Sequence, residues 1–320
     1  MYYIGIDIGG TNLKAGLVNE AGILLATEKM KVAALTDPAK MAWTLYALIQ
    51  KLCETTEIPV ERIASVGVGV PGIVEIHYGT IQYTCNLPWR NVPLRKLFHQ
   101  LSPLPLYIEN DANCAALAEY HVGAGRGTKR FITITLGTGI GGGVIHNGKI
   151  SHGANGMAGE VGHMVIERNG EPCPCGRKGC WEQYASAVAL KRITRQAMEA
   201  NPDSLLHRII EENDGHVSGQ SAFMAARQGC PVGQQVCGTY IEYLAAGISN
   251  LVNIYQPDAL AIGGGISNEE DSQLLLPVRR LVEQETIPCP SERRTRIVKA
   301  ELGTQAGLIG AALLGKNKRI

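Results

Sequence analysis

One histidine and three cysteines follow one another closely along the chain, as His163, Cys173, Cys175 and Cys180. Three sulfurs and one imidazole suit tetrahedral Zn²⁺. A disulfide between Cys173 and Cys175 would be badly strained, because only one residue separates them. The alternative is three unrelated free thiols. We favour a structural zinc site, since four protein ligands leave no open coordination position.

A second group of candidate residues is rich in glycine. The stretch Leu136–Gly143, LGTGIGGG, contains the spacing G-x-G-x-x-G of a dinucleotide-binding loop. Such a loop requires a helix directly after its glycines. Here three consecutive glycines disfavour a helix, and Asn147-Gly148 is typical of a hairpin turn. We therefore expect a loop between antiparallel strands that binds phosphate through backbone N–H groups and the Thr138 hydroxyl, rather than NAD. A tight hairpin without a ligand is the alternative.

The N-terminal stretch Asp7-Ile8-Gly9-Gly10-Thr11 resembles that loop and adds a carboxylate. An aspartate at a strand end beside a phosphate loop is well placed to hold Mg²⁺. A third glycine cluster, Gly263–Gly265, follows another apolar run, where adenosine could approach the backbone closely. Two phosphate loops and a third glycine cluster together predict a nucleoside triphosphate site.

These candidate residues lie at the ends of predicted strands and helices. Strands are expected over 2–8, 13–18, 23–26, 64–70, 104–108, 131–136 and 258–262, and helices from Asp37-Pro38 onward, over 112–122 and over 305–314. A shift of 128 residues places Tyr3–Gly9 on Phe131–Gly137 and Asn19 on Asn147. This repeat of strand, glycine turn and strand predicts a duplicated α/β architecture with a cleft between the halves.

Composition excludes several classes of protein. The 320 residues are enough for two domains, and a net charge of +1 without basic runs argues against nucleic-acid binding. We expect no signal peptide and no membrane span, because no basic segment precedes an apolar one and no apolar stretch reaches 18 residues. The odd count of nine cysteines fits a reduced, cytoplasmic protein.

The motifs stand in an order that resembles the ROK family of sugar kinases and repressors, within the hexokinase–actin superfamily. The resemblance covers essentially the whole chain and rests on Asp7–Thr11, Glu109–Asp111, Leu136–Gly143, Gly159–His163 and Cys173–Cys180. Segments 86–89, 180–186 and 225–229 are similar to those of bacterial ATP-dependent glucokinases. The resemblance implies two ribonuclease H-like α/β domains, a small one over 1–115 plus 306–320 and a large one over 116–305.

The resemblance also implies roles for individual residues. Asp111 matches the catalytic aspartate and would be the general base, although in isolation it would be interpreted as the N-cap of the following helix. The implied sugar-binding residues are Gly72, Asn86, Asn110, Asp111, Glu160, His163 and Glu182. The implied ATP and Mg²⁺ residues are Asp7, Gly9, Gly10, Thr11, Asn12, Lys14, Gly137, Thr138, Gly139, Gly264 and Gly265. His163 would bind zinc through one ring nitrogen and face the sugar with the other.

Glucose, ATP, Zn²⁺ and Mg²⁺ are therefore the expected ligands, and phosphorylation of glucose to glucose 6-phosphate, a step of glycolysis, is the expected reaction. A kinase for another hexose, such as N-acetylmannosamine, fructose or allose, stays an alternative, as does a sugar sensor without catalysis. ROK repressors carry a winged helix-turn-helix before the shared domains, and we expect none here because the first strand begins at Tyr2. Family members are commonly dimers or tetramers. Trp89 and Trp181 adjoin sugar-binding segments, with core packing at least as probable as ring stacking, and His152 has no partner that the sequence identifies.

Overall fold

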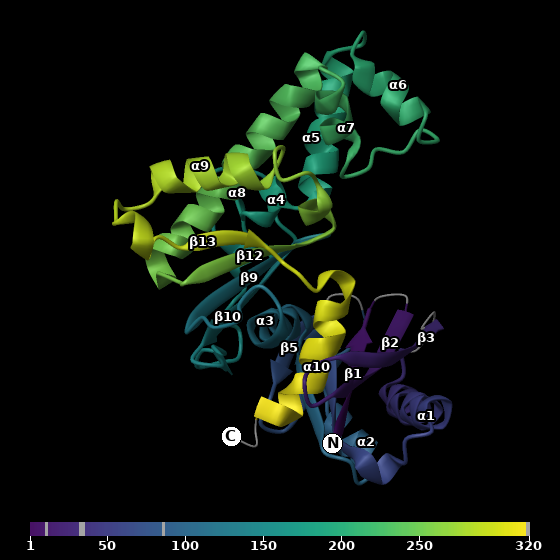
Figure 1. The fold of residues 1–320 in the computed structure, drawn as a ribbon. Coiled ribbons are helices and arrows are strands. Elements are labelled where there is room, and N and C mark those ends of the chain that lie inside the picture. The colour runs from purple at the N-terminus through teal and green to yellow at the C-terminus, as the bar shows by residue number, and fades with distance from the viewer. Residues whose placement is uncertain (10–11, 32–35, 85–86, 318–320) are drawn as a thin grey trace. The chain divides into compact units, whose positions relative to one another are not determined.

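The computed structural model describes residues 1–9, 12–31, 36–84 and 87–317. Its contacts divide the chain into two compact units, shown with their elements in Figure 1. Unit 1 consists of Met1–Thr133, Gly143–Gly159 and Glu301–Ile320, and unit 2 of Ile134–Gly142 and Glu160–Ala300. The domain boundaries expected from the sequence, near residues 115 and 305, and the cleft between the domains stay predictions.

Unit 1 contains a five-stranded sheet in the order β3-β2-β1-β4-β8. Its strands are β1 (Tyr2–Ile8), β2 (Asn12–Asn19), β3 (Leu24–Lys31), β4 (Ile63–Val70) and β8 (Leu106–Asn110). The first three strands are antiparallel neighbours, and β4 and β8 run parallel to β1. The prediction that the third strand ends at Ala26 was wrong. The strand continues to Lys31 because backbone pairing with β2 holds it, while every second side chain faces solvent.

Two helices cover opposite faces of this sheet, α1 (Pro38–Thr56) and α10 (Ala306–Asn317) (Figure 1). Alternate residues of a strand point to opposite faces, so Ile4 and Ile6 join the core under α1. Gly5 and Gly67 face the other way, and a Cβ at Gly67 would overlap the carbonyl oxygen of Ala311 in α10. Glycine is therefore required where this helix lies directly on the sheet.

The rest of unit 1 holds the helix that carries Asp111 and a small sheet that the sequence did not predict. These elements are η1 (Val60–Arg62), β5 (Gly72–Glu75), β6 (Thr80–Thr84), β7 (Arg90–Val92), α2 (Leu94–His99), α3 (Asp111–Val122) and η5 (Gly303–Gln305). The small sheet has the order β5-β6-β7. Helix α3 packs closely on α10, because Gly310 has no side chain to separate it from Cys114.

A second five-stranded sheet has the order β11-β10-β9-β12-β13. Its strands are β9 (Arg130–Leu136), β10 (Ile140–His146), β11 (Lys149–Ile150), β12 (Ala259–Gly264) and β13 (Arg296–Lys299). Asn147 and Gly148 both have positive φ angles, of 49° and 78°, and join β10 to β11 as a hairpin turn. The two strands expected in each copy are present, as β1 and β2 and as β9 and β10, and residues 10 and 11 of the first glycine turn lie outside the described residues.

Unit 2 is mainly helical after the segment 163–180, which carries the four candidate metal ligands. Its helices and single turns are η2 (Val161–His163), α4 (Glu182–Ala185), α5 (Ala187–Ala200), α6 (Leu205–Glu211), α7 (Ser221–Arg227), α8 (Pro231–Tyr255), η3 (Gly265–Asn268), α9 (Leu275–Glu285) and η4 (Ser291–Arg293). Trp181 is fully buried against Gly247 of α8, and its indole N–H donates to the Tyr243 carbonyl at 2.8 Å. Among the described residues, no helix is both long and apolar enough to cross a membrane.

Candidate active site and metal centre

The residues expected to act on the sugar hydroxyl lie where β8 meets α3. Asn110, and not Asp111, is the N-cap of this helix: its side-chain oxygen accepts from the backbone N–H groups of Ala112 at 2.9 Å and Asn113 at 3.2 Å. The Asn110 amide also donates to the carbonyl of Gly72 at 3.1 Å, which brings two predicted sugar residues together. Asp111 is the first helical residue, and its Oδ1 shares the Ala112 N–H with Asn110 at 2.9 Å, while the Asn113 N–H donates to Asn110.

The predicted magnesium aspartate lies at the end of β1. Asp7 stands opposite Lys14 in the antiparallel register of β1 and β2, and the Gly9 N–H donates to the Asn12 carbonyl at 3.0 Å across the turn. Burial raises the pKa of the Asp7 carboxyl, and the charge of Lys14 lowers it in part. A bound cation would stabilise the ionised carboxylate, so the residue fits a magnesium site. Gly10 and Thr11 lie outside the described residues.

Two glycine clusters of the predicted nucleotide site meet in unit 2. The Gly137 N–H donates to the Gly139 carbonyl at 3.0 Å, which closes the turn between β9 and β10. Gly264 adopts a φ of 88°, and a Cβ there would overlap the backbone of Leu136, directly before that turn. Around both Gly137 and Gly265 an added Cβ would meet open space. The backbone of both clusters is therefore close together and accessible.

The predicted sugar residues of unit 2 also lie together. The Nε2 atom of His163 is 4.0 Å from a Glu160 carboxylate oxygen, and its Nδ1 atom is 3.6 Å from Glu182 Oε1. A Cβ at Gly139 would come within 2.5 Å of Glu182 Oε2, so the predicted phosphate loop adjoins this acidic group. Two carboxylates and an imidazole can each accept or exchange hydrogen bonds with sugar hydroxyls. Asn86, the remaining predicted sugar residue, lies outside the described residues.

The four predicted metal ligands form one compact cluster. Their ligand atoms all lie within 4.8 Å of one another, with Cys173 Sγ 3.7 Å from His163 Nδ1 and Cys175 Sγ 3.6 Å from Cys180 Sγ. Zinc bonds of about 2.3 Å to sulfur and about 2.0 Å to nitrogen place pairs of tetrahedral ligand atoms roughly 3.5–3.8 Å apart. The residues therefore fit Zn²⁺, which His163 would hold through Nδ1, while its Nε2 lies 4.0 Å from the Glu160 carboxylate.

The thiols of this cluster do not ionise equally. Burial raises the pKa of Cys173 to about 12. For the exposed Cys175, burial raises the pKa, but the backbone N–H of Arg177 and hydrogen bonds to the neighbouring thiols outweigh it and lower the pKa to about 7. Cys175 is therefore the first sulfur to become a thiolate. Three sulfurs this close need a cation to be thiolates together, which a metal ion provides.

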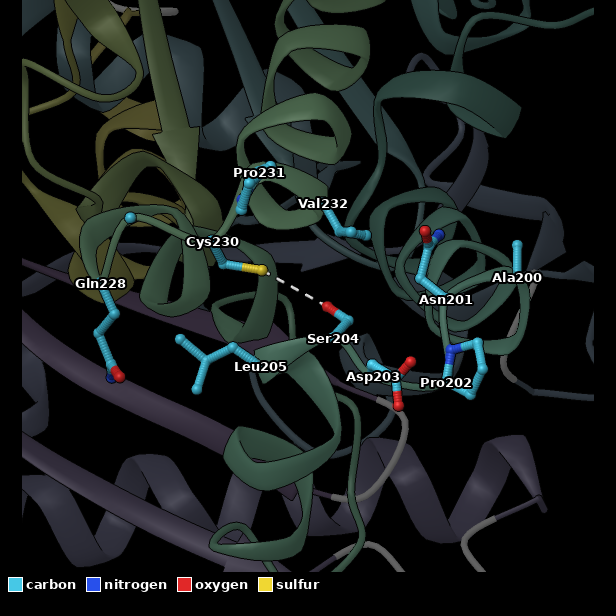
Figure 2. Close-up of a pocket in the computed structure, with 11 residues that line it drawn as sticks. Ala200, Asn201, Pro202, Asp203, Ser204, Leu205, Gln228, Cys230, Pro231 and Val232 are labelled. Carbon is cyan, nitrogen blue, oxygen red and sulfur yellow. Dashed lines mark hydrogen bonds between the residues drawn. The ribbon is translucent and has the colours of Figure 1, made fainter.

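Other parts of the structure bear on the remaining expectations. Trp89 and Trp181 are core residues, 2% and 0% exposed, so neither is placed to stack on a ligand. Unit 2 has a cavity of about 560 Å³ lined by residues 200–205 and 228–232 (Figure 2). In its lining, Cys230 Sγ is 3.4 Å from Ser204 Oγ. None of the predicted site residues that the structure describes lines this cavity.

Sequence reasoning missed the partner of His152. Its Nε2 atom is 2.6 Å from Oε2 of Glu109, the residue before Asn110 and Asp111. The only signals in the sequence were the position of Glu109 inside the Glu-Asn-Asp stretch and the position of His152 eight residues before Glu160.

Comparison with known proteins identifies the family. The family model described as "ROK family" matches residues 3–318. A glucokinase of Streptomyces coelicolor is 36% identical over 315 residues, covering 98% of this chain and 97% of that protein. The crystal structure of a ROK family glucokinase from Streptomyces griseus, in complex with glucose and AMPPNP, is 37% identical, covers 99% of both chains and superposes with a TM-score of 0.78. A xylose repressor of Caldicellulosiruptor bescii is 34% identical over 82% of this chain and 66% of its own length. The chain is a member of the ROK family, with the two-domain α/β fold of its kinases.

Proposed function

We propose that this protein is an ATP-dependent hexose kinase that transfers the γ-phosphoryl group of ATP to the 6-hydroxyl of glucose. The main support is similarity along nearly the whole chain to glucokinases, one of which has been solved with glucose and an ATP analogue. The positions of the predicted residues add to this support, because they gather at the strand ends and glycine turns of their own units.

Asp111 is the proposed general base. As the hydroxyl oxygen of the sugar forms a bond to the γ-phosphorus, the bond from that phosphorus to the bridging oxygen breaks and ADP leaves. The hydroxyl proton passes to the Asp111 carboxylate. The side-chain amide of Asn110 orients the same hydroxyl. Its hydrogen bonds to Gly72 and to the first turn of α3 hold this amide in place. A positioned base of this kind contributes about 10²–10⁴-fold to the rate.

The nucleotide is assigned to the glycine turns. The turn Gly137–Gly139 binds phosphate through its backbone and the Thr138 hydroxyl, and Gly264 and Gly265 lie against the nucleoside. Asp7 and Lys14, which face each other across β1 and β2, are assigned to the phosphates and their Mg²⁺. Gly9, Gly10, Thr11 and Asn12 are proposed to contact the nucleotide as well, and of these the structure describes Gly9 and Asn12. Mg²⁺, held by Asp7 directly or through water, neutralises charge on the phosphates when it is bound.

Glu160, His163 and Glu182 are the proposed sugar-binding residues of unit 2. Together with Cys173, Cys175 and Cys180, His163 would hold Zn²⁺ through Nδ1, which would leave the Nε2 N–H available to a sugar hydroxyl beside Glu160. The ion would orient this ring and thereby support sugar affinity, without a part in phosphoryl transfer. We further propose that the active form is a homodimer or homotetramer, which light scattering of the purified protein measures directly.

The proposal is tested by measuring ADP release with Mg-ATP against glucose, mannose, fructose, N-acetylglucosamine, N-acetylmannosamine and allose. Asp111→Asn is expected to bind glucose and to lose about 10²–10⁴-fold in kcat. The matched control is Asp37→Asn at the N-cap of α1, where asparagine caps equally well and activity should not change. Turnover of another sugar, without turnover of glucose, would keep the kinase assignment and change the assigned substrate. Normal turnover of Asp111→Asn would refute its role, and no turnover on any sugar by zinc-loaded protein would favour a sugar sensor.

A further inference from the structure

A buried carboxylate lies directly before the proposed catalytic residues. The side chain of Glu109, on β8, is 5% exposed, and that of His152 is 25% exposed. The Oε2 atom of Glu109 forms a hydrogen bond of 2.6 Å with His152 Nε2. Its Oε1 atom accepts from the Asn110 backbone N–H at 2.9 Å and from the Asn113 side-chain amide at 3.0 Å. Both oxygens are thus hydrogen-bonded, as a buried charge requires.

The hydrogen bonds on Oε1 fix the turn from β8 into α3. Asn110 is held through its backbone N–H by Glu109 and through its side chain by Gly72 and the first turn of α3. Asn113, one turn into that helix, is held by the same carboxylate. Movement of the Glu109 side chain would therefore move Asn110 and, with it, the adjacent Asp111.

The hydrogen bond on Oε2 fixes a loop. His152 begins the segment 152–158, which closes on itself where the Ala158 N–H donates to the His152 carbonyl at 3.1 Å. Gly153 and Gly156 permit this path with φ angles of 67° and 78°, and a Cβ at Gly156 would lie 3.1 Å from the carbonyl oxygen of Val74 in β5. This loop, which we call the His152 loop, leads along the chain to Glu160.

We propose that His152 and Glu109 are positioning residues for phosphoryl transfer. The histidine donates a hydrogen bond that keeps the buried carboxylate in place beneath Asn110 and Asp111, and the carboxylate in turn holds the start of the His152 loop. Neither residue touches the reacting atoms in this assignment. The inference rests on the proposed function, because it requires Asn110 and Asp111 to act on the substrate.

A second buried carboxylate, Glu119 on the following helix α3, provides the contrast. Glu119 is 1% exposed and accepts from the backbone N–H groups of Ala124, Glu301 and Leu302 at 2.8–3.1 Å. These bonds hold the far end of α3 against the returning C-terminal segment, away from the Asn110–Asp111 turn. Loss of Glu119 should therefore affect folding alone, whereas loss of the His152–Glu109 pair should affect the reaction.

The test compares His152→Ala, His152→Gln and Glu119→Gln by steady-state kinetics well below their unfolding temperatures. Without the histidine donor, we expect kcat on glucose to fall about 10²-fold, the effect of a misplaced catalytic group. The KM for ATP should change less than about threefold, because the lost interaction is not made with the nucleotide. Glutamine can donate from a position near that of Nε2, so His152→Gln should recover most of kcat. Glu119→Gln should lower the unfolding temperature and leave kcat unchanged.

A double variant keeps the test valid if His152→Ala folds poorly. Glu109→Gln added to His152→Ala replaces an uncompensated buried charge with a neutral amide, so it should raise the unfolding temperature of that variant. The inference is overturned if His152→Ala is less stable yet keeps wild-type kcat, or if His152→Gln is as slow as His152→Ala. If the wild-type protein phosphorylates no hexose, the proposed function itself fails, and the inference fails with it.

Discussion

Replacing Cys175 with serine should release zinc and weaken glucose binding in the same variant. Cys175 is the exposed sulfur of the cluster, so the change leaves no cavity in the core, as a change at the buried Cys173 or Cys180 would. The side chain of serine is a much poorer zinc ligand than a thiolate. The substitution therefore tests metal binding without a change in core packing.

The magnitude follows from the number of ligands. Structural zinc sites bind with roughly 10–16 kcal/mol of apparent free energy, so one of four ligands contributes about 3 kcal/mol. At about 1.4 kcal/mol per factor of ten, zinc affinity should fall about 10²-fold. His163 then loses the metal on Nδ1 that orients its ring, and glucose affinity should fall about 10–100-fold, as when other groups around a metal are removed.

The assay measures zinc content after competition with a chelator, glucose affinity by calorimetry, and the unfolding temperature with and without added zinc. Cys289→Ser is the control, because this half-buried thiol lies outside the cluster. Full zinc affinity in Cys175→Ser would show that Cys175 is not a ligand. A zinc-free variant with wild-type glucose affinity would refute the coupling between the metal and the sugar.

Two further substitutions probe unit 1. Burial raises the folded-state pKa of Asp7, so the stability that this group contributes is present at low pH and is lost as the pH rises through that raised value. At pH 7 Asp7→Asn should therefore raise the unfolding temperature of the metal-free protein while it lowers Mg-ATP turnover, and a lower unfolding temperature in calorimetry would contradict this sign. Gly67→Ala should destabilise unit 1 by about 1–3 kcal/mol or more in urea unfolding, because its Cβ meets the backbone of α10. Gly238→Ala in α8, where a Cβ meets open space, should instead stabilise by up to about 1 kcal/mol, and equal effects of the two changes would refute the packing argument.

Local patterns predicted the elements that carry the glycine turns. The strand expected over 2–8 and the helix start at Asp37-Pro38 are both confirmed, since these signals depend on neighbouring residues alone. The strand β3 extends beyond its prediction because its last residues are held by pairing with β2 rather than by burial. The small sheet β5-β6-β7 was not predicted, because its strands are only three to five residues long and too short for a periodic pattern.

The candidate site was predictable to the extent that its residues form short motifs. The four zinc-type ligands span 18 positions and could be grouped from the sequence, and the structure brings them together. The pair of Glu109 and His152 is separated by 43 positions, and neither residue alone has a pattern that indicates the other. The sequence also could not decide the N-cap of α3. Both Asn110 and Asp111 are good capping residues, and only the backbone angles distinguish them.

The two strand–turn–strand copies differ in charge, and this difference bears on the proposed role of each turn. With the shift of 128 residues, Asp7 corresponds to Thr135 and Lys14 to Gly142. The first copy thus places a carboxylate opposite an ammonium group, while the second offers only backbone N–H groups and a hydroxyl. A carboxylate near phosphates is favourable only with a cation between them. Burial raises the pKa of Asp7, so a cation beside it would favour its ionised form. In the proposed function both turns contact phosphate, and only the first carries an aspartate of its own that would share a cation with the phosphates.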